Sequence, residues 1–295
     1  MKTTPKGALF AKTLSSLTRA FLPALGGLLV WTPLTWGQRP SEADAAALIE
    51  KSRDRALAYA RSLPDFVCTE VIRRYAETRP QTVRGLSRSG GPMQSPAANK
   101  WTPTDKLTVK LSYFQQKEDH SLVLVNDKPT SLKYEGLAGG TGAGEFGGTL
   151  QNIFERHAQT VFKWESWKNI RRHRAAVYSY NVEAEHSHYL VMNGVPGDTH
   201  EAVVKFHGTL DVDRETGEVL HLTYTADQIP KEVKVDRVST TVDYDFADVA
   251  GRNYLLPTHS ETQIYSPGLS VMNEMDFREY RKFSTDSTIE FGVGK

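Results

Sequence analysis

Two histidines are the first residues whose types and spacing could do chemistry. His186 and His188 lie two positions apart, so both imidazoles would face the same side of a β-strand. Some zinc sites use such a pair, but a catalytic zinc usually also needs a third protein ligand and a carboxylate that activates water. The candidates for these roles are Glu183, Glu185, His200 and His207. No pattern in the sequence brings them together, so we predict no metal and no other cofactor.

A glycine-rich run over residues 139–148 could bind phosphate groups. Gly142, Gly144 and Gly147 formally fit the G-x-G-x-x-G pattern of dinucleotide-binding proteins. That pattern acts between a buried parallel strand and a helix, and residues 131–135 do not form such a strand pattern. We therefore interpret the three glycines as a gate over a cavity, followed by one inserted short helix. The apolar face of this helical region would consist of Phe146, Leu150, Ile153 and Phe154.

The sequence contains no recognisable nucleophile. Cys68 is the only cysteine, and it lies between apolar neighbours such as Val67 and Val71, which predicts a buried structural thiol. No nearby cation or helix start would lower its pKa. The chain also has neither a G-x-S-x-G turn nor an H-E-x-x-H helix. We therefore predict that the protein is not an enzyme.

Alternating apolar and polar residues place most of residues 202–283 on β-strands. The apolar positions of the clearest runs are Val204, Phe206, Leu210 and Val212, then Leu220, Leu222 and Tyr224, then Val238, Val242, Tyr244 and Phe246. The turn residues 213–217 join the first two runs as a hairpin. Strands with one polar face indicate an antiparallel sheet, because parallel strands are usually apolar on both faces.

One helix precedes about eleven such strands. Ser41 would cap its first turn, an apolar stripe continues to Leu63, and Pro64 ends it. A first strand is expected from residue 66 to 75, followed by a mobile polar loop over residues 76–104. The predicted fold is mainly β (α+β): a curved antiparallel half-barrel wrapped on the N-terminal helix, forming a single domain over residues 38–295.

The first 37 residues have the composition of a secretory signal peptide. Four basic residues and no acidic ones precede an apolar run at 21–36, which is shorter than the ~20 residues of a spanning helix. The four cations are Lys2, Lys6, Lys12 and Arg19. Their removal from 36 basic and 35 acidic residues leaves a net charge near −3 and no basic stripe for nucleic acid. We predict a periplasmic or secreted protein without a stable membrane span after cleavage.

Aromatic residues on the expected strands offer a binding surface. If the half-barrel is not filled by its helices, its apolar side would line a cavity for an acyl chain or another apolar guest. The predicted lining residues are Tyr178, Tyr180, Phe206, Leu222, Tyr224, Tyr244 and Phe246. Ordinary core packing is the alternative explanation of the same pattern.

The order of these features resembles a known superfamily. A secretion signal, one amphipathic helix and about eleven antiparallel strands, with the late turn "LDVDRETGEVLHLTY", resemble the half-barrel superfamily of the bacterial lipoprotein carrier (LolA-like) and the periplasmic stress-sensor regulator. The segments "LPDFVCTEVIRRY", "GEFGGTLQNIFERH", "NYLLPTHSE" and "MDFREYRKF" are similar to segments of uncharacterised exported bacterial proteins. The resemblance implies a curved sheet around a helix with an apolar cavity, and it assigns no functional residues.

Three functions follow from this reading. The first is an exported envelope protein that binds a hydrophobic ligand, a lipid or a lipidated partner in the half-barrel cavity. The second is an envelope scaffold or sensor that contacts a protein partner through a sheet edge or its loops. The third is a hydrolase or metalloenzyme that uses His186 and His188.

Overall fold

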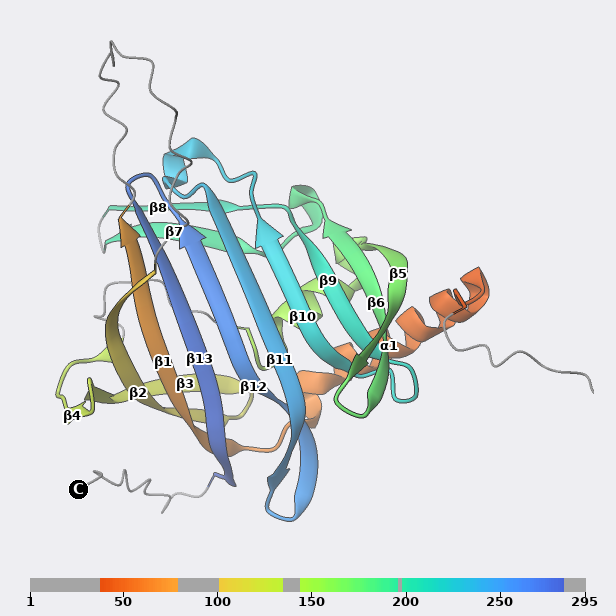
Figure 1. Ribbon diagram of the computed structural model, residues 1–295, viewed down its shortest axis with the longest axis horizontal. Helices are drawn as coiled ribbons and strands as arrows, with labels where there is room; N and C mark the ends of the chain where they lie inside the picture. Colours follow the sequence, from red (N-terminus) through yellow and green to blue (C-terminus); the bar gives the residue numbers. More distant parts are fainter. Residues whose placement is uncertain (1–37, 79–100, 135–143, 196–197, 284–295) are drawn as a thin grey trace, which may run out of the picture. The chain divides into compact units, whose positions relative to one another are not determined.

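An open antiparallel sheet of eleven strands forms most of the protein (Figure 1). The computed structural model describes residues 38–78, 101–134, 144–195 and 198–283. The strand order in the sheet is β4-β3-β2-β1-β13-β12-β11-β10-β9-β6-β5, and β7 pairs with β8 in a separate two-stranded ribbon. Every pairing is antiparallel and the large sheet does not close into a barrel, which confirms the predicted fold class.

The described residues up to Val182 contribute the two α-helices and strands β1 to β6. These elements are α1 (Glu42–Ser62), β1 (Phe66–Thr78), β2 (Thr102–Phe114), β3 (Lys117–Val125), β4 (Lys128–Pro129), α2 (Gly148–Phe154), β5 (Val161–Ile170) and β6 (His173–Val182). The remaining strands are β7 (Leu190–Val195), β8 (Asp198–Val203), β9 (Phe206–Asp213), β10 (Val219–Ala226), β11 (Arg237–Val249), β12 (Arg252–Tyr265) and β13 (Leu269–Lys282). Three short 3-10 helices connect them, η2 (Arg156–Ala158), η3 (Ala184–His186) and η4 (Lys231–Val233).

Irregularities in strand pairing explain why the sheet curves. The register shifts between Val67 and Thr69 in the β1–β13 pair, between Trp164 and Ser166 in the β5–β6 pair, and between Asp243 and Tyr244 in the β11–β12 pair. A bulge of this kind leaves one residue unpaired, bends its strand and increases the local twist. Because such shifts occur in several strands, the long sheet wraps partly around the helices instead of remaining flat.

Helix α1 lies along one side of the sheet and is held there by three tyrosines (Figure 1). Ser41 caps it as predicted, because its Oγ accepts a hydrogen bond from the N–H of Asp44 at 3.1 Å. The hydroxyls of Tyr178 on β6 and Tyr113 on β2 donate to the carbonyls of Ala45 and Ala60, at 3.0 and 3.1 Å. In the opposite direction, the hydroxyl of Tyr59 on α1 donates to the carbonyl of Leu255 on β12 at 2.9 Å. The helix therefore spans strands from β6 to β2.

The turn after β9 has a carboxylate at its centre. Asp213 accepts hydrogen bonds from the N–H groups of Glu215 and Thr216 at 2.7 and 2.8 Å, and its other oxygen lies 2.5 Å from His173 Nδ1. Burial opposes ionisation of Asp213, but these partners outweigh it and hold the pKa of this carboxyl below its ordinary value. The hairpin of β9 and β10 predicted from the sequence is confirmed by their pairing.

The polar segment predicted as a loop over residues 76–104 is partly strand. Ala76 pairs with both Val271 on β13 and Thr102 on β2, and β1 continues to Thr78. The prediction was wrong at both ends of this segment. Polar residues continue β1 there because it pairs with β13, and polar and proline residues begin β2 because it pairs with β1. Residues 79–100 lie outside the described residues. Neither helix within the described ranges has the length and apolar character needed to cross a membrane.

Candidate ligand pocket and the covered face of the sheet

Protein side chains fill the space in which the sequence predicted a cavity. Six of the seven predicted lining residues are at most 5% exposed: Tyr178, Tyr180, Phe206, Leu222, Tyr224 and Tyr244. They pack in one cluster with Ile49 and Tyr59 of α1 and with Ile153 and Phe154 of α2. These six positions therefore lie in a packed core beneath the helices, and Tyr178 also lines an open pocket.

Phe246 departs from this pattern. It is 45% exposed, so the prediction that it faces the covered interior was wrong. Its ring lies 6.2 Å from that of His173, and its side chain lines a shallow cavity of about 190 Å³ together with Tyr59 and Leu255. The alternation of the sequence gives the face of the strand, but it does not show how far along β11 the helices cover that face.

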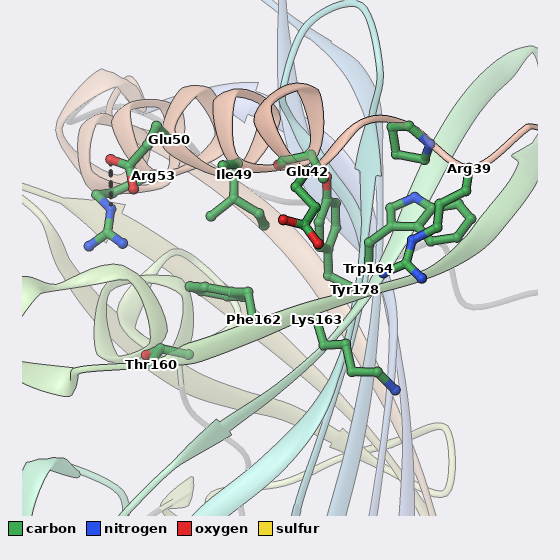
Figure 2. A pocket seen from close by; sticks show the side chains of 13 residues that line it. Arg39, Glu42, Ile49, Glu50, Arg53, Thr160, Phe162, Lys163, Trp164 and Tyr178 are labelled. Atoms are coloured by element: carbon green, nitrogen blue, oxygen red, sulfur yellow. Dashed lines mark hydrogen bonds and ion pairs between the residues drawn. The ribbon is translucent and has the colours of Figure 1, made fainter.

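An open pocket of about 440 Å³ lies between the N-terminal half of α1 and strands β5 and β6 (Figure 2). We call it the α1–β5 pocket. It is lined by Arg39, Pro40, Glu42, Ala45, Ala46, Ile49, Glu50, Arg53, Thr160, Phe162, Lys163, Trp164 and Tyr178. Its volume lies in the range of about 300–1,000 Å³ that is typical of small-molecule sites. In Figure 2, Ile49 points from α1 toward Phe162, and Lys163 extends away from the helix.

The apolar walls of the α1–β5 pocket are fixed by contacts with the core. Phe162 stacks on Phe154 of α2 with ring centroids 5.3 Å apart, and its ring also lies 6.4 Å from that of Tyr180. Tyr178 is held by its hydrogen bond to Ala45, and burial raises its pKa to about 12, so the phenol stays a neutral donor. These contacts hold the side chains of the walls in position before any ligand binds.

The rim of the α1–β5 pocket carries charges of both signs. Arg53 donates to the carbonyl of Phe154 at 3.0 Å and its Nε lies 3.3 Å from a carboxylate oxygen of Glu50. The guanidinium of Arg39 lies over the ring of Trp164, 5.7 Å from its centroid. Trp164 also has a buried indole N–H without a hydrogen-bond acceptor among the described residues. A buried donor without an acceptor is costly.

The glycine-rich run ends in a short segment that crosses the covered face of the sheet. Gly142 lies outside the described residues, whereas Gly144 and Gly147 have φ values of 108° and 112°, which other residues rarely adopt. A Cβ on Gly147 would also lie 3.0 Å from Ala60 Cβ, so α1 can approach closely only because this residue is glycine. We call residues Gly144–Gly147 the strap. Tyr244 anchors it by donating a hydrogen bond to the carbonyl of Glu145 at 2.9 Å.

The predicted histidine pair is not on a strand. His186 ends η3 and His188 follows it in an irregular segment, so the expectation of two rings on one strand face was wrong. Instead, both rings lie near His157 of η2, with centroid distances of 5.8 and 5.2 Å. The sequence analysis missed His157, which lies far away along the chain. In the part of the chain that the structure describes, no group of three or more His, Cys, Asp or Glu side chains could hold a metal ion.

Fold and site together define an open antiparallel half-barrel with a pocket beside its covering helix. No family model matches the chain, and no curated protein matches its sequence. Among solved structures, a LolA superfamily protein from Nitrosomonas europaea is 10% identical, with 81% of this chain and 94% of that chain covered and a TM-score of 0.32.

Two further solved structures are similar. A DUF1329 family protein from Desulfovibrio piger is 11% identical over 81% of this chain and 95% of that one, with a TM-score of 0.36. A putative outer membrane lipoprotein-sorting protein domain from Vibrio parahaemolyticus is 12% identical over 83% and 95%, with a TM-score of 0.34. These neighbours include the superfamily that the sequence resembles, and the likeness concerns the fold alone.

Proposed function

We propose that this chain is an exported, non-enzymatic envelope protein that binds an apolar ligand, or the acyl chain of a lipidated partner, in the α1–β5 pocket. The observation that carries this proposal is an open cavity of about 440 Å³ with apolar walls and a charged rim. The sequence-based cavity was expected deeper in the half-barrel, where core side chains now lie. The proposed binding site is therefore at the end of the covered face.

The walls of the pocket supply the binding energy for an apolar tail. Ile49, Phe162 and Trp164 present aliphatic and aromatic surface to the cavity. Removing apolar surface from water contributes roughly 25 cal/mol per Å². Because Ile49 is only 6% exposed, most of the surface removed from water belongs to the ligand's own chain. Because the walls are held by the core, little of this energy is lost in ordering the protein.

The rim supports a ligand whose tail ends in a group that accepts hydrogen bonds. The Trp164 indole N–H has no acceptor among the described residues, and Arg39 lies beside it. A carboxylate, ester or phosphate oxygen near Trp164 would pair with the Arg39 guanidinium. We therefore propose an amphiphile, with its tail toward Phe162 and its polar end toward Arg39.

Export is proposed from the leader-like composition of residues 1–37. The four cations and the apolar run are the signal that supports it. A single cysteine cannot form an internal disulfide, so an exported domain of this kind must be stable through its core. The two buried clusters, which together with the side chains packed against them extend from β3 to β5, support that requirement.

Filling the pocket is expected to abolish binding. Ala46 lies on the exposed side of α1 and lines the pocket, so Ala46→Trp would place an indole in the cavity without disturbing the core. We expect the affinity for a fluorescent long-chain fatty acid to fall at least about tenfold, or ~1.4 kcal/mol. Ala47→Trp is the matched control, because Ala47 is exposed on the same helix but does not line the pocket. Equal affinity in both variants and the wild type would reject this site.

An edge-binding scaffold is the second candidate, favoured by one observation. Strand β5 is the last strand of the sheet, and Val161 on it is 70% exposed. An extended segment of a partner could pair with such an edge. The Ala46→Trp protein separates the two functions, because a partner that pairs with the β5 backbone would still be captured by crosslinking when the fatty acid no longer binds.

A further inference from the structure

Three carboxyl groups meet beneath the strap. Glu145 belongs to the strap itself and is 4% exposed, while Glu70 on β1 is 3% exposed. Glu118 on β3 is the third, and it is half-buried. Their ionisation is coupled: the charge of Glu145 raises the pKa of both Glu70 and Glu118, and the charge of Glu118 also raises the pKa of Glu70. They come from three elements that are far apart in the sequence.

The aromatic contacts of the strap bring these groups together. Phe146 inserts between Phe66, Tyr113 and Phe277, with ring centroids 5.3, 6.0 and 5.6 Å away. Phe277 is the cross-strand partner of Glu70, and Tyr113 is the partner of Glu118. Glu145, the residue before Phe146, therefore lies against the sheet near the carboxyls of Glu70 and Glu118. Packing of one ring thus fixes the depth of Glu145.

These carboxyls have few partners that would stabilise a charge. Oε1 of Glu145 accepts a hydrogen bond from the hydroxyl of Ser260 at 3.3 Å. Oε2 of Glu70 has no hydrogen-bond donor among the described residues, and Nε2 of His120 lies 3.7 Å from it. An ionised carboxylate in such surroundings is strongly disfavoured, whereas a protonated carboxyl is tolerated.

The other titratable groups around the cluster are mostly neutral acids. Around Glu145 and Glu70 they are the phenols of Tyr134, Tyr189, Tyr224, Tyr244 and Tyr280, the thiol of Cys68 and the imidazole of His120. Tyr59 of α1 and Tyr113 of β2 face Glu118, and the cation of Arg74 on β1 acts on Tyr134. Burial raises the pKa of the Cys68 thiol and of the Tyr244 phenol, so both groups stay neutral beside the carboxyls.

Burial changes the ionisation of all three carboxyls in the same direction. It raises the pKa of Glu70 to about 8, with contributions from Glu145 and Glu118, and the pKa of Glu118 to about 7. Burial also raises the pKa of Glu145, against the effect of its hydrogen bonds. The closed strap therefore binds more protons than an open one. The free energy that favours the closed strap over the open one is therefore largest below about pH 4.5 and falls as the pH rises to about 8.

We propose that the strap is a proton-controlled latch, which stays on the sheet while Glu70, Glu118 and Glu145 carry protons and lifts off when they ionise. Gly144 and Gly147 bound the moving segment and have the backbone freedom that hinges need. Opening would uncover the aromatic surface of Phe66, Tyr113 and Phe277. This inference goes beyond the proposed function, since none of these residues lines the α1–β5 pocket.

The single cysteine reports this opening. Cys68 is fully buried in the cluster that contains Phe146, so a thiol reagent reaches it only when the strap is open. The rate of labelling is divided by the rate for the same protein in denaturant at the same pH, which removes the effect of thiol ionisation. Since each proton released on opening changes the opening equilibrium up to about tenfold per pH unit, we expect labelling to accelerate at least about 100-fold between about pH 5.5 and pH 7.5.

Neutral variants test the assignment of the carboxyls. Glu145→Gln and, independently, Glu70→Gln should each reduce the acceleration of Cys68 labelling with pH, because each removes one of the ionising groups, while Glu201→Gln, at an exposed position on β8, should behave like the wild type. Low urea concentrations should hardly change the labelling, because a local opening exposes little surface. The proposal would be overturned if protection of Cys68 in the wild type did not change with pH. It would also be overturned if both cluster variants lost protection to the same extent as the wild type.

Discussion

Replacing Gly208 by alanine is expected to destabilise the protein by about 3 kcal/mol or more, one of the largest effects of a single methyl group in this fold. Gly208 lies on β9 between Tyr180 of β6 and Tyr224 of β10. A Cβ at this position would lie 1.9 Å from the carbonyl oxygen of Thr223 and 2.6 Å from its carbon. Because β9 is paired on both sides, neither backbone can move away without breaking strand hydrogen bonds.

Equilibrium unfolding in urea measures this effect. Gly148→Ala is the matched control, because Gly148 lies in the first turn of α2 and an added Cβ would contact nothing within 4 Å. Alanine there should be neutral or stabilising by up to about 1 kcal/mol. If Gly208→Ala unfolded within about 1 kcal/mol of the wild type, the close approach of β9 and β10 described here would be incorrect.

Phe146→Ala is expected to cost about 3–5 kcal/mol, because it removes a buried ring and leaves a cavity among three others. Phe146 is buried against Phe66, Tyr113 and Phe277. The variant should also lose protection of Cys68 at low pH, where the carboxyls are protonated, since the ring no longer holds the strap. Urea unfolding and thiol labelling together measure both effects.

Phe114→Ala is the aromatic control for that variant. Phe114 ends β2 and is exposed, although its ring lies 5.0 Å from that of Phe283. Its loss should cost about 1 kcal/mol or less and leave Cys68 protected. A similar cost for both variants would mean that Phe146 is not packed into the sheet as the structure has it.

The strands and their faces could be predicted from the sequence because burial on one face leaves a simple alternating pattern. Leu210, Val212, Leu222 and Tyr244 are all buried as that pattern requires. An alternating pattern does not show where a covering helix ends. For this reason Phe246 was predicted to be covered, although it is exposed. It also fails where strands continue through polar residues, as β1 does to Thr78.

The candidate sites depend on contacts between distant segments, which local patterns do not reveal. The α1–β5 pocket combines Ala46 with Phe162 and Trp164, more than a hundred positions away in the sequence. The acidic cluster did leave one signal. Phe66, Cys68, Glu70 and Ile72 occupy alternate positions on β1, so the apolar neighbours already placed the Glu70 carboxyl on the buried face.

The proposed ligand site is tested most directly by mapping where a photoreactive fatty acid attaches. After irradiation and digestion, we predict adducts on two segments, the N-terminal half of α1 around Ala46 and Ile49, and β5 around Phe162 and Trp164. Adduct formation should be lost in Ala46→Trp and retained in Ala47→Trp. Adducts confined to other parts of the chain, or equal labelling of the two variants, would contradict binding in the α1–β5 pocket.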